Sequence, residues 1–141
     1  MKALRALVVS SALLLVAAVL LTGLFRKADE TCSNRLVGQS VSPDGSSKIV
    51  TFVRDCGATT SFSVQAALLP VRGPLPANPN SVFVADDDHG RAPIDSTGVP
   101  NIIIRWRDAR SVLIEYSSLA RVFKADTSSS GVQIHYSPIN G

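Results

Sequence analysis

The chain has 141 residues, and its 14 Lys or Arg and 11 Asp or Glu residues give a formal net charge of +3. Four of the basic residues precede Ala28, and the 114 residues from Ala28 onward carry ten basic and eleven acidic side chains. This nearly neutral segment is long enough for one domain but has no excess of basic residues, so we expect no nucleic-acid partner.

The first predicted element is a transmembrane helix over residues 6–25. These 20 residues carry no charge, and 16 of them are Ala, Val, Leu or Phe. As a helix they would span about 30 Å, the thickness of a hydrocarbon core. The run is longer than the roughly 7 to 15 apolar residues of a signal peptide, and no small-x-small cleavage site precedes Ala28. We therefore interpret residues 1–27 as a signal anchor, with a cleaved secretory signal as the alternative.

Both interpretations place residues 28–141 outside the cytoplasm. With an anchor, the protein is a single-pass protein of the cell membrane, in contact with the bilayer through residues 6–25. After cleavage, it would instead be periplasmic or secreted. Two basic residues stand on each side of the apolar run, so the preference of Lys and Arg for the cytoplasmic side does not fix the orientation of the helix. The pair of cysteines after the run favours a domain outside the cytoplasm.

Cys32 and Cys56 are the only cysteines, and 24 positions separate them. An even number of cysteines in an exported domain favours a disulfide, which would stabilise a loop of this length by about 3 kcal/mol. One alternative is a zinc site that adds His89 and His135, but the compact spacings of zinc modules are missing. The other is a nucleophilic Cys, which would need a neighbouring His that the sequence does not place.

From Ser42 onward the sequence predicts short strands separated by turns. The Ser-Pro-Asp-Gly run at 42–45 is a turn signal, and apolar residues alternate with Ser, Gln and Ala along 61–68, whose polar face we expect to be solvated. The run 107–110 has the length of a hairpin connection. The predicted strands are 48–54, 62–68, 81–85, 101–106, 111–116, 121–125 and 132–136.

These six or seven strands, with no amphipathic helix among them, predict an all-β fold. We expect a small antiparallel sandwich or a barrel-like domain, preceded by the one transmembrane helix. Large aromatic residues supply much of a small β core. The expected bulky core residues are Phe52, Phe62, Phe83, Trp106, Tyr116 and Phe123.

Two long loops interrupt the strands, at 70–80 and at 86–100. Four prolines fall within residues 70–79, which excludes a helix or a central strand there. Long ordered loops often carry function. The first loop could be the inhibitory element of an inhibitor or immunity-type protein, in which case residues 74–78 would be dispensable for stability.

The run Asp86-Asp87-Asp88-His89-Gly90 is the densest group of ionisable side chains. Asp86, Asp88 and His89 could bind a divalent cation, and a metal-dependent, hydrolytic site is one hypothesis. The calcium-loop pattern fails, because Thr97 stands where the last acidic ligand belongs. We favour a solvated acidic turn that ends an edge strand, and we predict no catalytic residue and no resident cofactor.

The stretches Ser-Pro-Asp-Gly, Arg-Asp-Cys-Gly-Ala-Thr-Thr and Val-Phe-Val-Ala-Asp-Asp-Asp-His-Gly resemble those of a group of small uncharacterised exported or membrane-anchored bacterial proteins. The similarity covers residues 42–62 and 82–90. It implies a bacterial source and export, and it brings no activity with it. The leading hypothesis is therefore a non-catalytic envelope protein that binds another protein or a surface component.

Overall fold

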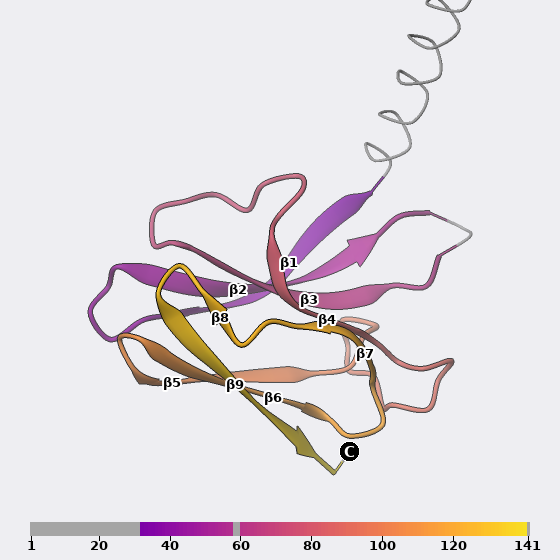
Figure 1. Cartoon of the computed structure of the whole chain (residues 1–141). Helices are drawn as coiled ribbons and strands as arrows, with labels where there is room; N and C mark the ends of the chain where they lie inside the picture. The colour runs from indigo at the N-terminus through magenta and orange to yellow at the C-terminus, as the bar shows by residue number, and fades with distance from the viewer. Residues whose placement is uncertain (1–31, 58–59, 141) are drawn as a thin grey trace, which may run out of the picture. The chain divides into compact units, whose positions relative to one another are not determined.

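The structure, a computed structural model, describes residues 32–57 and 60–140. The predicted transmembrane helix at 6–25, with the rest of the expected anchor 1–27, lies outside these residues. Within the described ranges, no helix is both long and apolar enough to cross a bilayer. These residues form strands and connections, and the all-β expectation is confirmed (Figure 1).

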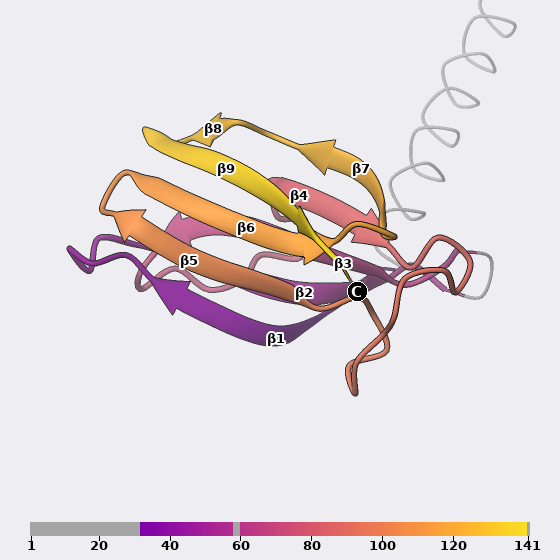
Figure 2. The ribbon, with the colours of Figure 1, turned by 90° about the horizontal axis from the view of Figure 1, so that it is seen from below.

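The strands form two separate sheets, which lie one above the other in Figure 1 and are seen from below in Figure 2. Five strands in the order β1-β2-β3-β4-β7 make the first sheet, and four in the order β5-β6-β9-β8 make the second. Their bounds in chain order are β1 Ser33–Val41, β2 Ser47–Asp55, β3 Ser63–Pro70, β4 Ser81–Asp86, β5 Ile102–Asp108, β6 Ser111–Ser117, β7 Arg121–Ala125, β8 Ser128–Ser129 and β9 Val132–Ile139.

The expectation of purely antiparallel pairing was wrong at one position. β6 and β9 pair in parallel, with Val112 beside Ile134 and Ile114 beside Tyr136. After β6 the chain leaves the second sheet, adds β7 to the edge of the first and then returns through β8. This detour lets β9 enter the second sheet in the same direction as β6. The predicted hairpin of β5 and β6 is confirmed, with Ala109 and Arg110 at its turn.

The main core lies between the two sheets. β2, β3 and β4 contribute buried aliphatic side chains from one sheet, and β6 and β9 contribute them from the other. Phe83 is fully buried at the centre, and its ring lies 5.2 Å from that of Tyr116 and 5.6 Å from that of Tyr136. The Tyr136 hydroxyl donates to the backbone oxygens of Val82 and Asp126, which joins the two layers, and its burial raises the pKa of Tyr136.

A second, smaller core covers the outer face of the first sheet. Val50, Phe52 and Ala67 are buried there, with Leu75 of the proline-rich loop packed against them. The polar face predicted for residues 61–68 belongs to this side, and Gln65 is buried rather than solvated. The expectation was wrong because Leu75 of the loop packs over β2 and β3 on this face, and because Gln65 is hydrogen-bonded to Ser63 and Ser81.

The aromatic residues predicted for the core divide into two groups. Phe52 and Phe83 are fully buried, and Trp106 and Tyr116 pack against the main core. Phe62 and Phe123 are not core residues, since 52% and 59% of their surfaces are exposed. Phe62 precedes the first paired residue of β3, and Phe123 lies on the edge strand β7.

The disulfide between Cys32 and Cys56 joins the residue before β1 to the residue after β2. β1 lies before Ser42, where the sequence predicted no strand, and it pairs with β2 from Ser33 opposite Asp55. The same end of the domain, here called the Cys32 end, holds residues 56–57 and 60–62 between β2 and β3, together with the connections 87–101 and 118–120. The strand registers bring these connections together, because β2, β4 and β6 all end there.

Candidate functional site

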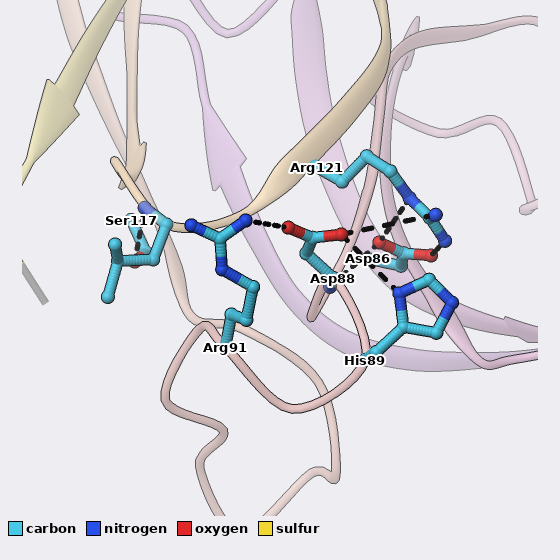
Figure 3. A network of polar contacts seen from close by, with 7 residues as sticks. Asp86, Asp88, His89, Arg91, Ser117 and Arg121 are labelled. Atoms are coloured by element: carbon cyan, nitrogen blue, oxygen red, sulfur yellow. Dashed lines mark hydrogen bonds and ion pairs between the residues drawn. The ribbon is translucent and has the colours of Figure 1, made fainter.

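The acidic cluster of the sequence is built around a pair between neighbouring strands. Asp86 ends β4 and lies opposite Arg121, the first residue of β7. Arg121 Nη2 donates to Asp86 Oδ2 at 2.5 Å, and Nε donates to Oδ1 at 3.2 Å (Figure 3). Burial raises the pKa of Asp86, but the hydrogen bonds from Arg121 and from the Asp88 N–H outweigh it and leave that pKa below its ordinary value.

Asp88 and His89 follow in a tight turn, and both have positive φ angles, of 47° and 60°. Asp88 Oδ2 accepts from Arg91 Nη1 at 2.9 Å, and Asp88 Oδ1 lies 3.5 Å from His89 Nδ1 and 4.0 Å from Arg121 Nη1. The His89 side chain is 75% exposed. The turn is thus fixed by ion pairs to two arginines, as Figure 3 shows.

The three candidate metal ligands Asp86, Asp88 and His89 do lie close together, but arginines occupy the two carboxylates. In the described part of the chain, no group of three or more His, Cys, Asp or Glu side chains is arranged to hold a metal ion. The expectation of a simple solvated turn also needs correction at Asp86, whose side chain is only 5% exposed. The sequence could not show this, because the partner Arg121 is 35 positions away.

The other cysteine hypotheses do not agree with the structure. Both sulfur atoms are in the disulfide, so neither the zinc site nor the nucleophilic Cys is present. His135 lies on β9 with its side chain exposed, as the alternation of residues 132–136 predicts.

The proline-rich loop does not project from the domain. Asn34 on β1 donates to the Ala77 oxygen at 2.8 Å, and Arg54 on β2 donates to the same oxygen at 3.0 Å and to Asn78 Oδ1 at 2.9 Å. Leu75 covers the small outer core at the same time. An inhibitory loop has to project from the domain to enter its target, whereas this loop is held against β1 and β2.

The Cys32 end instead carries an exposed aromatic ring between two hollows. One hollow, of about 310 Å³, is lined by Arg35, Asp55 and Phe62 together with Thr97 and Gly98. The other, of about 190 Å³, is lined by Ser61, Phe62, Asp87, Gly98, Val99 and Pro100. Arg35 Nη2 donates to the Thr97 oxygen at 2.6 Å, which ties β1 to the connection 87–101. We call Phe62 with these two hollows the Phe62 surface.

Sequence reasoning missed this surface because a phenylalanine near a strand is usually a core residue. A local signal was nevertheless present. Phe62 follows Thr59-Thr60-Ser61 directly after a turn, and pairing with β2 begins only at Ser63. Ser61, next to Phe62, and Asp87, which follows β4, line the same hollow.

Comparisons of the chain with protein-family models, with curated proteins and with solved structures find no match. The candidate site therefore rests on its own geometry.

Proposed function

We propose that this chain is a membrane-anchored bacterial envelope protein whose β domain binds another envelope protein and catalyses no reaction. The apolar run at 6–25 would hold it in the cell membrane, with residues 28–141 outside the cytoplasm. The disulfide supports an oxidising compartment, because such bonds persist mainly outside the cytoplasm.

The observation that carries the proposal is the exposure of Phe62 between two hollows. Aromatic side chains that meet pockets are enriched among the residues that contribute most to protein–protein binding. The ionisable groups nearby support binding rather than catalysis, since Asp86 and Asp88 are held by arginines. Burial raises the pKa of Asp86, but the hydrogen bonds from Arg121 lower it below its ordinary value, which makes this carboxylate a poor general base.

Photo-crosslinking in intact cells tests the proposal. A photoreactive amino acid at Ser61, which is exposed beside Phe62, should capture one protein partner from the envelope. The matched control is the same amino acid at Gln133, exposed on β9 of the second sheet, which should capture no such partner. The adducts are detected on the full-length chain by a C-terminal tag and identified by mass spectrometry.

A specific adduct from Ser61 that Gln133 does not give would support the proposal. Equal labelling from the two positions, or no adduct from either, would contradict the assignment of the Phe62 surface as a binding site. Adducts to cytoplasmic proteins alone would contradict the proposed location.

A further inference from the structure

The size of the two hollows favours one class of ligand over another. Small-molecule pockets enclose roughly 300 to 1,000 Å³ and bury most of their ligand. Of the hollows that Phe62 lines, the larger, of about 310 Å³, only reaches the lower end of this range, the smaller, of about 190 Å³, falls below it, and both are open to solvent. Each is of a size to accept one or two side chains, which suits an extended protein segment.

The charged side chains at the Phe62 surface indicate which charge the bound segment carries. Of the three consecutive aspartates, Asp86 is paired with Arg121 and Asp88 with Arg91. For Asp87, no ion pair or side-chain hydrogen bond is found within residues 32–57 and 60–140. Its side chain is half-buried and is the one charged side chain that lines the smaller hollow, beside Phe62, Val99 and Pro100.

A half-buried carboxylate against an aromatic ring and an aliphatic wall is complementary to a cationic side chain. A lysine or arginine there gains an ion pair with Asp87, and its methylene groups pack on the apolar wall. The face of the Phe62 ring adds a cation–π attraction when the charge lies over it. The domain already has one such contact, where Arg121 lies 4.9 Å from the ring centre of Phe123.

We propose that the Phe62 surface binds a protein segment that places an apolar side chain against Phe62 and a lysine or arginine beside Asp87. This inference rests on the proposed binding function and names the chemistry of its partner. An anionic lipid surface is the competing occupant, and the carboxylate of Asp87 in the smaller hollow disfavours it.

The test compares variants of the full chain that carry the photoreactive amino acid at Ser61. Asp87→Asn removes the charge with little change in shape and should lower the yield of the partner adduct about fivefold. Phe62→Ser should lower it about tenfold or more. The matched controls are Asp108→Asn, at the turn between β5 and β6, and Phe123→Ser, on β7, which should leave the yield unchanged.

The captured peptide should contain a lysine or arginine within about four residues of the crosslinked position. A synthetic copy of that peptide should bind the full chain, and replacing its basic residue with glutamine should weaken binding about fivefold. If the adduct forms equally well with Asp87→Asn, the charge inference is wrong while the binding function stands. The absence of any adduct would contradict the binding function itself, and adducts to lipid would show the competing occupant.

Discussion

Among the ionisable residues, one buried carboxylate governs the geometry of the Cys32 end. Asp86 holds Arg121 on the neighbouring strand and also accepts the backbone N–H of Asp88, which starts the turn at His89. Its side chain is 5% exposed, whereas that of Arg121 is 40% exposed. Neutralising Asp86 therefore removes the counter-charge of an arginine that still reaches water.

Asp86→Asn should destabilise the domain by about 1 to 2 kcal/mol. Breaking a fully buried pair costs about 3 to 5 kcal/mol, and the exposure of Arg121 reduces this cost. Thermal unfolding of the full chain in detergent measures the effect, with Asp108→Asn at the exposed turn as the control. A change no larger than that of the control would show that the pair adds no stability.

The same variant predicts a pH dependence. The pKa of Asp86 in the folded protein lies below its ordinary value of 3.8, so its ionised form favours folding above that value. This contribution disappears as the pH falls through the lowered pKa. The difference in melting temperature between the protein and Asp86→Asn should thus be constant near neutral pH and shrink below pH 3.8. A difference that grows in acid would reverse the assigned sign.

The local sequence pattern was sufficient to predict most of the strands. The features that it did not predict depend on residues far apart in the sequence. Alternation and turn signals located the strands from β2 to β7, and β9. The polar strand β1 was missed because its sequence, Ser-Asn-Arg-Leu-Val-Gly-Gln-Ser-Val, has no regular alternation and is stabilised by pairing with β2. The exposure of Phe62 depends on where that pairing stops, and the Asp86–Arg121 pair depends on β7 joining the first sheet.

The position of the proline-rich loop also depends on residues far away in the sequence, because Leu75 packs on the outer face of the first sheet. Leu75→Ala should destabilise the domain by about 1 to 2 kcal/mol, because it uncovers Val50 and Phe52 on the outer face of the first sheet. Trypsin cleavage at the exposed Arg72 should become faster, since the loop loses its apolar contact.

Leu36→Ala is the matched control for this prediction, because Leu36 is 51% exposed on the edge strand β1. It should change the melting temperature and the cleavage rate very little. If Leu75→Ala behaves like Leu36→Ala, the loop is not part of the folded domain in solution. A free inhibitory loop would then be the better interpretation of residues 70–80.

Across the whole domain, charged and apolar exposed groups are unevenly placed. Eight large apolar side chains are strongly exposed in residues 32–57 and 60–140, and four of them, Phe62, Ile94, Leu119 and Ile139, lie at the Cys32 end, where β6 and β9 also finish. The other four lie on the edge strands β1 and β7. The opposite end carries polar turns such as Ser42–Gly45, where Ser42 Oγ donates to Asp44, and the two ends of the proline-rich loop. The exposed apolar residues outside the edge strands therefore gather at the end of the domain that holds the disulfide.

The disulfide is part of the fold and also indicates an oxidising compartment. Thiol labelling tests the bond and the location of the domain. In intact cells, a membrane-impermeant maleimide should label neither Cys32 nor Cys56 until a reductant is added, because each sulfur is bonded to the other. Reduction should lower stability by about 3 kcal/mol, the cost of releasing a loop of 24 residues.

Labelling of both cysteines without reductant, and only after lysis, would place the domain in the cytoplasm. The envelope proposal would then be wrong, although the two sheets could still form, since β1 and β2 are also joined by their strand pairing. Labelling in intact cells that requires reductant would instead fix the domain outside the membrane. In that case the partner of the Phe62 surface has to be an envelope protein, because only such proteins reach that side of the bilayer.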